Sequence, residues 1–378
     1  MRIGINTLAV IPSEIGGTQT YLRKLIENLA RIDRSNEYFL FVGPWNKDLF
    51  EIKQENFQPM MCNIPVKPLA IRVLYEQIIL PFFAWKNKID IFHFPANVSP
   101  FVLSCPSVLT IHDTCAFTIP ELIPAILRQY WKIMVRSSAR NANVVIAVSR
   151  SSKENIVRFL GISKEKIQVI YHGSEHQILE ARGQNYSVSG QNEVGGHFPY
   201  VLWVGKLFSH KNLPRLLHAF AKLIETSKMK YRLVICGMRS WGYSPLVKTV
   251  KELGLQGRVI FKGYVPHNEL KPIYNNACLF VFPSLIETFG LPILEAMSHG
   301  VPVVTSNYGA MAEIAGDAAL LVDPYDVDEI VEAMHKVLTD ENLRKDLIKK
   351  GLERAKQFSW EKTARETLSV YKKACGKE

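Results

Sequence analysis

The segment that decides the fold assignment is residues 282–297, which read FPSLIETFGLPILEAM. An apolar run ends near Phe282, and Pro292 stands where the first turn of a helix tolerates proline. Gly290 comes just before that helix, and a residue without Cβ lets the backbone approach a ligand closely. The N–H groups of residues 289–291 would point out of the helix N-terminus, which attracts anions. The segment therefore predicts a strand, a loop and a helix that hold a phosphate group where they meet.

Two carboxylates flank this predicted phosphate site. Glu287 lies in the loop, and Glu295 lies about one turn into the helix. A carboxylate accepts hydrogen bonds from neighbouring sugar hydroxyls, whereas a helix N-terminus suits a diphosphate. Together these groups indicate a nucleotide-sugar as the ligand.

Outside this segment, short apolar runs alternate with helical patterns over most of the chain. Such alternation is typical of a parallel sheet with helices on both faces. The pattern breaks between residues 174 and 199, where Gly, Ser and Asn are frequent. We therefore predict an α/β fold with two doubly wound, Rossmann-like domains, residues 1–180 and 200–356, joined by a linker at 181–199.

The composition excludes several classes of protein. The 378 residues are 47% hydrophobic and 21% charged, which is ordinary for a globular chain. The formal charge of +11 is spread over both halves without a Lys/Arg run, so no nucleic-acid partner is expected. No stretch reaches the ~20 apolar residues of a membrane span. The six cysteines form no Cys-x-x-Cys pair, which suits free thiols in the cytoplasm.

A second motif follows the first strand of the second half, where residues 204–212 read VGKLFSHKN. Lys206 and Lys211 are two cations in one loop and can clamp a diphosphate. Their charge would also stabilise the negative charge that develops on a leaving group.

Two further candidates lie in the first half. Gly16, Gly17 and Thr18 stand between the first strand and the first helix, where the backbone can approach a ligand. His112 and Asp113 follow a strand, and ligands of open α/β sheets bind beyond the carboxyl ends of strands. We expect Asp113 to orient His112 or to cap the next turn.

The segment 282–297 resembles the signature of glycosyltransferase family 4, because its Glu-x7-Glu pair stands inside Pro-Ser-x-x-Glu-Thr-Phe-Gly-Leu-Pro-x-x-Glu-Ala-Met. The resemblance implies a retaining enzyme of the GT-B fold, whose two domains face each other across a cleft. The first domain would carry the acceptor and the second the donor, and the final helix, 357–378, would pack back onto the first domain. Lys206 departs from the Arg that is commoner at its position, and lysine lacks the bidentate fork of arginine.

The resemblance also implies roles for individual residues. His112 would orient the donor sugar, Glu287 would hold its hydroxyls, and Lys206 with Lys211 would stabilise the departing diphosphate. The substrate-binding set is Gly16, Gly17, Thr18, Val265, Thr288, Phe289, Gly290, Leu291 and Glu295.

No metal ion or other cofactor is expected, because lysines and a helix dipole supply the positive charge. The Asp-x-Asp at residues 326–328 matches a motif of metal-dependent transferases, but its position predicts a helix cap.

The predicted reaction is transfer of a hexose from a nucleotide-sugar to a hydroxyl of a growing, lipid-linked or free, polysaccharide. UDP-glucose is the favoured donor. GDP-mannose is a close second, since residues 211–217 resemble stretches of mannosyltransferases. Two alternatives remain: a non-hydrolysing sugar-nucleotide epimerase, and a non-catalytic subunit that binds a glycan or a partner protein.

A basic stripe stands out in the first half. Residues 122–153 contain six basic side chains and no acidic one. Four of the six recur at every fourth position and would share one side of a helix: Arg128, Lys132, Arg136 and Arg140. The stripe is either a solvated helix face or a docking surface for anionic lipid, which would place the protein peripherally on the inner membrane face.

Overall fold

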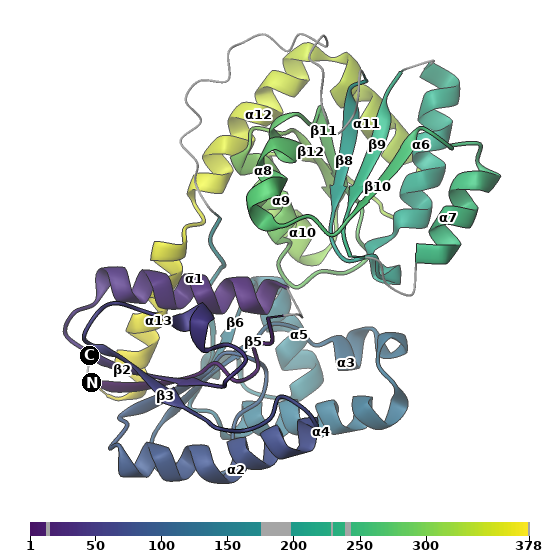
Figure 1. The fold of residues 1–378 in the computed structure, drawn as a ribbon. Coiled ribbons are helices and arrows are strands. Elements are labelled where there is room, and N and C mark those ends of the chain that lie inside the picture. Colours follow the sequence, from purple (N-terminus) through teal and green to yellow (C-terminus); the bar gives the residue numbers. More distant parts are fainter. Residues whose placement is uncertain (13–15, 175–197, 228–229, 239–242, 377–378) are drawn as a thin grey trace. The chain divides into compact units, whose positions relative to one another are not determined.

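The structure is a computed structural model that describes the chain apart from residues 13–15, 175–197, 228–229, 239–242 and 377–378. The chain forms two compact units. Unit 1 comprises residues 1–173 and 359–378, and unit 2 comprises residues 174–358 (Figure 1). The expected linker, residues 181–199, lies outside the described residues except for 198 and 199.

Within the described residues, unit 1 is built on a seven-stranded parallel sheet in the order β3-β2-β1-β4-β5-β6-β7. The strands are β1 (Arg2–Asn6), β2 (Glu37–Val42), β3 (Phe57–Met61), β4 (Ile91–Phe94), β5 (Ser107–Ile111), β6 (Val144–Ala147) and β7 (Ile167–Val169). The helices are α1 (Gly17–Ile32), α2 (Leu69–Lys86), α3 (Cys115–Thr118), α4 (Ala125–Asn141), α5 (Arg150–Leu160) and α13 (Trp360–Ala374).

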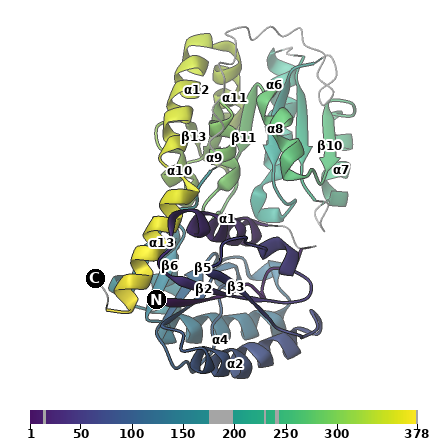
Figure 2. The same cartoon turned by 60° about the vertical axis from the view of Figure 1, so that its left-hand side comes forward.

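Helices cover both faces of this sheet. Helices α2 and α4 lie on one face, and α1 and α13 lie on the other (Figure 2). On the first face, side chains of alternate strand positions pack with Leu80 and Ala84 of α2 and with Val135 of α4. Consecutive strand residues point to opposite faces, so the sheet is buried on both sides, as expected for a parallel sheet.

A buried chain of hydroxyl and imidazole groups holds α13 on unit 1. The hydroxyl of Tyr21 on α1 lies 3.2 Å from Oγ1 of Thr110 on β5. That Oγ1 lies 2.8 Å from Nε2 of His93 on β4, and Nδ1 of His93 lies 2.7 Å from the hydroxyl of Tyr371 on α13. All four side chains are buried, so the contacts satisfy polar groups that are removed from water.

Unit 2, in its described part, is built on a six-stranded parallel sheet in the order β10-β9-β8-β11-β12-β13. The strands are β8 (Tyr200–Val204), β9 (Arg232–Cys236), β10 (Val259–Gly263), β11 (Leu279–Phe282), β12 (Val303–Ser306) and β13 (Leu320–Val322). The helices are α6 (Leu213–Ser227), α7 (Tyr243–Glu252), α8 (His267–Asn275), α9 (Leu291–Ser298), α10 (Gly309–Ala315), α11 (Val327–Thr339) and α12 (Glu341–Lys356). Helix α11 packs on α6, and α12 packs on α9.

The Asp-x-Asp at 326–328 caps a helix, as predicted. Asp326 is the N-cap of α11, and its carboxylate accepts hydrogen bonds from the backbone N–H groups of Asp328 and Glu329. These bonds satisfy two of the donors that a helix N-terminus leaves unpaired.

Candidate active site

Lys211 and Glu287 form the centre of the candidate site in unit 2. Lys211 follows β8, and Glu287 lies in the loop between β11 and α9. Nζ of Lys211 donates a hydrogen bond to Oε1 of Glu287, and the two side chains are only 14% and 13% exposed. The same Nζ lies 5.2 Å from the ring centroid of Phe282, the last residue of β11. The fold thus brings a cation and a carboxylate from separate motifs into direct contact, as joint action on one ligand requires.

Asn212 ties three loops together beside this pair. It adopts a left-handed backbone conformation (φ 61°), which asparagine tolerates better than most residues. Its Nδ2 donates to the carbonyl oxygens of Pro283 (2.9 Å) and Pro324 (2.6 Å). The N–H of Leu285 donates to the carbonyl oxygen of His210 at 2.8 Å. The loops that follow β8, β11 and β13 are therefore held in one arrangement at the carboxyl edge of the sheet.

The N-terminus of α9 has the form that the sequence predicted. Gly290 is the N-cap residue with φ 97°, a conformation that side chains rarely adopt, and Pro292 stands in the first turn. Phe289 is buried and its ring meets that of Phe358 edge to face at 6.2 Å. Gly290 and Leu291 follow directly, with Thr288 half-buried before them. Helix α9 thus begins four residues after Glu287, and its N-terminal amides can hold an anion there.

Tyr274 orients Glu295 inside α9. The buried hydroxyl of Tyr274 donates to Oε2 of Glu295 at 2.9 Å. Burial, together with the negative charge of Glu295, raises the pKa of Tyr274 well above its usual range, so the hydroxyl stays a donor. The Tyr274 ring stacks on His299 at 5.4 Å, and Nδ1 of His299 lies 2.9 Å from Oδ1 of Asn275. Tyr274 was not among the predicted site residues, since a tyrosine in a helix carries no motif.

Three glycines close the ends of β8, β9 and β10. The N–H of Gly205 donates to the carbonyl oxygen of Cys236 (2.9 Å), and the N–H of Gly237 donates to that of Gly263 (2.8 Å). A Cβ at Gly237 would lie only 1.7 Å from the carbonyl oxygen of Gly205. The strand ends can therefore meet only without a side chain at Gly237.

The glycine-lined edge carries the two other predicted residues of unit 2. Lys206 directly follows Gly205, and Val265 comes two residues after Gly263; both side chains are partly exposed. The edge thus presents backbone groups between a cation and an apolar side chain, an arrangement that a nucleotide can occupy. Gly237 was not predicted, although a glycine directly after a strand is a usable signal.

In unit 1, His112 is buried at the end of β5. Its ring meets that of Tyr21 edge to face at 4.8 Å, and its Nε2 lies 2.8 Å from the carbonyl oxygen of Pro95. Burial lowers the pKa of His112 to about 4, so the ring is neutral near pH 7. A neutral ring that donates from Nε2 keeps Nδ1 as an acceptor. Asp113 caps the next turn, because its Oδ1 accepts the N–H of Cys115 at 3.0 Å.

The glycine-rich turn opens α1, the helix that also carries Tyr21. Gly16 is the N-cap of α1, and Gly17 and Thr18 form its first turn. The two residues before this turn, Glu14 and Ile15, lie outside the described residues. Helix α1 therefore links the two predicted sites of unit 1, because it begins at the glycine turn and its Tyr21 contacts His112.

The described part of the chain contains no cluster of three or more His, Cys, Asp and Glu side chains placed to hold a metal ion. Lys211 and the N-terminal amides of α9 supply positive charge beside Glu287. This site offers charge stabilisation by protein groups for an anionic ligand.

Two sequence families match the chain. A model described as "Glycosyltransferase Family 4" matches residues 15–177, and one described as "Glycosyl transferases group 1" matches residues 189–354. Together these matches span both units.

Individual proteins agree with these matches. The chain is 32% identical over 373 residues to O-antigen chain mannosyltransferase B of Escherichia coli, covering 94% of this chain and 96% of that protein. It is 31% identical over 275 residues to O-antigen chain mannosyltransferase RfbU of Salmonella typhimurium, covering 72% and 69%. Among solved structures, sucrose-phosphate synthase from Thermosynechococcus elongatus superposes with a TM-score of 0.77 at 22% identity, over 100% of both chains.

Proposed function

Because this chain belongs to glycosyltransferase family 4, we propose that it transfers mannose from GDP-mannose to a hydroxyl of a growing polysaccharide. Membership of this family makes the chain a glycosyltransferase, and its two parallel sheets agree with the GT-B fold. The choice of mannose rests on the relatives, whose names describe O-antigen chain mannosyltransferases. UDP-glucose, the donor favoured by the sequence, is the competing prediction.

The contact between Lys211 and Glu287 carries the proposal. In the transfer, the bond between the anomeric carbon and the phosphate oxygen breaks, and its electron pair leaves with the diphosphate. Lys211 and the amides of residues 289–291 stand where they can stabilise that charge. Glu287 can accept hydrogen bonds from sugar hydroxyls. The negative charge of its carboxylate can stabilise the positive charge that develops at the anomeric carbon. The acceptor oxygen forms the new bond and releases its proton to solvent or to the diphosphate.

The remaining residues bind and orient the donor. Glu295, which is oriented by the hydrogen bond from Tyr274, would accept hydrogen bonds from the ribose hydroxyls. Val265 would lie beside the base. Lys206 would approach the diphosphate from the glycine-lined edge. Nδ1 of His112 would accept a hydrogen bond from a sugar hydroxyl, because Nε2 already donates its hydrogen to the Pro95 carbonyl oxygen. We further propose retention at the anomeric carbon and catalysis without a metal ion.

Donor binding tests the choice of sugar nucleotide. Thermal unfolding of the full chain is followed with GDP, UDP, GDP-mannose and UDP-glucose, since a ligand that binds the native state raises the unfolding midpoint. We expect GDP and GDP-mannose to raise it and the uridine ligands to leave it unchanged. A rise with UDP-glucose alone would replace the proposed donor and leave the proposed reaction class intact.

Turnover tests the reaction class. The donor is incubated with and without a mannose-containing acceptor oligosaccharide, and products are separated by mass. We expect a product one hexose larger, the anomeric configuration of the donor in its NMR spectrum, and an unchanged rate in excess EDTA. Epimerised donor in the absence of acceptor would support the epimerase alternative. Donor that remains intact after prolonged incubation with acceptor would support a non-catalytic subunit.

A further inference from the structure

Helix α2 of unit 1 presents an apolar face to solvent. Five large apolar side chains on this helix are each between 43% and 67% exposed: Ile71, Leu74, Ile78, Phe82 and Trp85. At about 100° per residue they fall within an arc of about 80°, along about 20 Å of helix. The opposite side of α2 is apolar as well, because Leu80 and Ala84 lie in the core of unit 1. A surface helix of a water-soluble domain is normally polar on its outer face. An exposed apolar face of this size therefore indicates a surface that contacts a membrane or another molecule.

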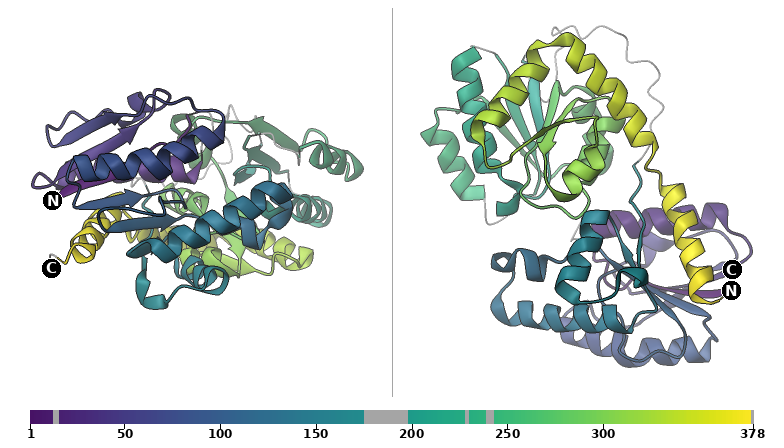
Figure 3. Two further views of the ribbon diagram at one scale, coloured as in Figure 1. Left: turned by 90° about the horizontal axis from the view of Figure 1, so that it is seen from below. Right: turned by 180° about the vertical axis from the view of Figure 1, so that it is seen from behind.

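The apolar surface continues onto the elements beside α2. The loop of residues 97–104 is joined to α2, where the N–H of Phe101 donates to Oε1 of Gln77 at 3.0 Å. It is joined to α4 as well, where Nδ2 of Asn141 donates to the carbonyl oxygen of Phe101 at 3.3 Å. Phe101 and Val102 are exposed in this loop, and Ile133 is exposed on α4. Helices α2 and α4 lie side by side in the view from below in Figure 3.

Exposed cations border this face, and the nearby acids are occupied. Lys67, Lys86 and Lys88 are exposed at the two ends of α2. Between residues 66 and 104 the acids are Glu76 and Asp90. Glu76 is buried beside Arg72, and Oδ2 of Asp90 accepts the N–H of Arg2. The border of the apolar face is therefore positive.

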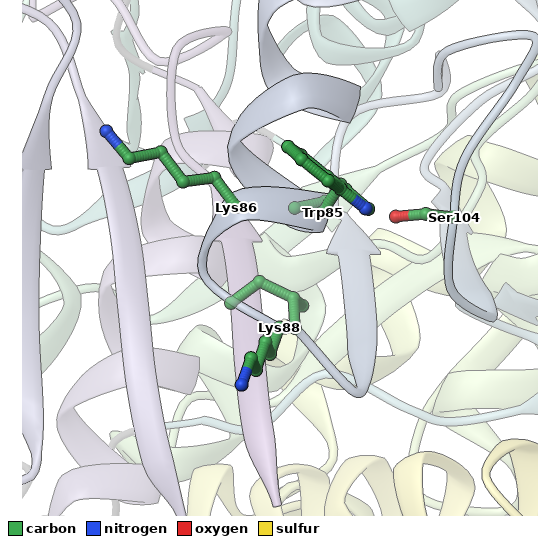
Figure 4. Close-up of a pocket in the computed structure, with 6 residues that line it drawn as sticks. Trp85, Lys86, Lys88 and Ser104 are labelled. Carbon is green, nitrogen blue, oxygen red and sulfur yellow. The ribbon is translucent and has the colours of Figure 1, made fainter.

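A pocket of about 500 Å³ lies at the C-terminal end of the face. Trp85, Lys86, Lys88 and Ser104 are among the residues that line it. Figure 4 shows the indole nitrogen of Trp85 directed toward the Ser104 hydroxyl, with the two lysine ammonium groups pointing in different directions. Indole, hydroxyl and ammonium groups beside an apolar face are the groups that meet phosphate headgroups at a membrane surface.

The cations of the basic stripe on α4 are partly engaged in contacts within unit 1. The guanidinium of Arg128 donates to the carbonyl oxygen of Pro120 at 3.0 Å. Lys132 and Arg136 lie over the ring of Phe117, at 5.5 Å and 5.4 Å from its centroid. Three of the four predicted cations thus make contacts inside unit 1, although Arg136 is exposed, as is Arg140.

We propose that the lipid-binding face, defined as the five exposed residues of α2 with Phe101 and Val102, rests in the surface of an anionic lipid bilayer. The side chains would enter the boundary between headgroups and acyl chains, and Lys67, Lys86 and Lys88 would meet the anionic headgroups. A second copy of the chain is a poorer occupant, because a two-fold contact through this face would bring equal cationic borders together. The inference concerns unit 1 alone and does not depend on which sugar is transferred.

Vesicle flotation of the full chain tests this inference without donor or acceptor. The vesicles contain equal parts of phosphatidylglycerol and phosphatidylcholine, or phosphatidylcholine alone. We expect the parent to float with the anionic vesicles. Leu74→Gln combined with Ile78→Gln should bind more than about tenfold more weakly, since burial of each large apolar side chain contributes about that factor. Lys86→Gln combined with Lys88→Gln should lose most of the preference for anionic vesicles.

Matched variants on unit 2 serve as controls. Val247→Gln changes an exposed apolar residue on α7, and Lys349→Gln changes an exposed lysine on α12. Both should bind vesicles like the parent. All variants change exposed residues, so their unfolding midpoints should match the parent's, and this match shows that lost binding is not lost folding.

Two results would overturn the inference. One is vesicle binding that is absent in the parent or unchanged in the Leu74/Ile78 variant. The other is a parent dimer that this variant converts to a monomer, which would identify a second copy as the occupant. Fluorescence gives an independent readout: brominated lipid should quench the parent more than Trp85→Phe, and equal quenching would contradict insertion of the face.

Discussion

The hydroxyl of Tyr274 donates a 2.9 Å hydrogen bond to Oε2 of Glu295, across the interface of α8 and α9. Tyr274 is buried and stacked on His299, so the donor cannot turn away from the carboxylate. One carboxylate oxygen of Glu295 is thereby fixed in direction before any ligand arrives. Such preorganisation lowers the entropy cost of binding a nucleotide.

Tyr274→Phe should therefore weaken nucleotide binding more than it weakens the fold. A hydrogen bond to a charged group contributes about 1.5–3 kcal/mol, so we expect an increase in the Kd for GDP of about tenfold or more. Titration calorimetry measures it. Tyr308→Phe, which changes an exposed tyrosine of unit 2, should leave the Kd unchanged. An unchanged Kd in Tyr274→Phe would remove Glu295 from the nucleotide site.

The Lys211–Glu287 contact should contribute to both stability and turnover, and variants can separate the two. Lys211→Met leaves a carboxylate that is 13% exposed without its cation, which should cost about 2–3 kcal/mol of unfolding free energy. Lys211→Met combined with Glu287→Leu should recover most of that stability, because neither charge remains. Neither variant should transfer sugar at a measurable rate.

Urea unfolding and the transfer assay measure these two effects. The control is Lys222→Met, which breaks the exposed ion pair with Asp328 on the same unit and should change stability little. Parent-like turnover in the double variant would show that the pair is purely structural.

The parts of the fold that the sequence predicted are those with a clear pattern of apolar residues along the chain. Residues 107–111 form one of the short apolar runs of the first half, and this run coincides with β5, which is buried along its whole length. Helix α2 was missed, since its exposed face is as apolar as its buried face and no helical alternation remains. Strand β3 was missed for the opposite reason: it lies at the edge of the sheet and contains Pro59 and exposed positions. Edge strands of this kind carry little of the periodic signal.

The residues of the candidate site also fall into those that the sequence predicted and those that it missed. Glu287, Gly290 and Glu295 were predicted as site residues because they stand in one short motif. Tyr274 and Asn212 act through contacts with residues 21 and 71 positions away in the sequence, which only the fold brings together. A buried tyrosine or asparagine has the same identity whether it orients a ligand-binding group or fills the core. Sequence alone therefore indicates the groups proposed to bind the ligand more readily than the groups that position them.

Buried histidines should make unit 1 sensitive to acid. Burial lowers the pKa of His112 to about 4 and that of His93 to about 3. In the unfolded chain a histidine titrates near 6.5, so below that pH the unfolded state binds more protons than the native state. The free energy of unfolding should be highest above pH ~6.5 and should fall as the pH drops from there toward the folded pKa.

His112→Gln isolates one of these contributions. A buried histidine lowers the free energy of unfolding by up to ~1.4 kcal/mol per pH unit in this window. Because the unfolded histidine is only half protonated at pH 6.5, the loss between pH 6.5 and pH 5 should be about 1.6 kcal/mol smaller in the variant. Urea unfolding at a series of pH values measures the slope. His335→Gln changes an exposed histidine on α11 and should leave the slope unchanged. Equal slopes for the parent and His112→Gln would mean that His112 is already charged in the native state.

Gly237 permits the close approach of β8 and β9 at the glycine-lined edge, and Gly237→Ala should break it. The added Cβ would lie 1.7 Å from the carbonyl oxygen of Gly205, a backbone atom that cannot move without shifting the strand end. We expect a loss of about 2–4 kcal/mol in unfolding free energy and a higher Kd for the nucleotide, because Lys206 follows Gly205 directly. Gly351→Ala is the control: its Cβ would come no closer than 3.3 Å to Met297, and alanine favours the helix in which it lies. If Gly237→Ala kept the parent's stability but lost nucleotide binding, the clash would be relieved by a local shift of the Lys206 loop. If Gly237→Ala kept both the parent's stability and its nucleotide binding, the ends of β8 and β9 would not require a glycine at position 237.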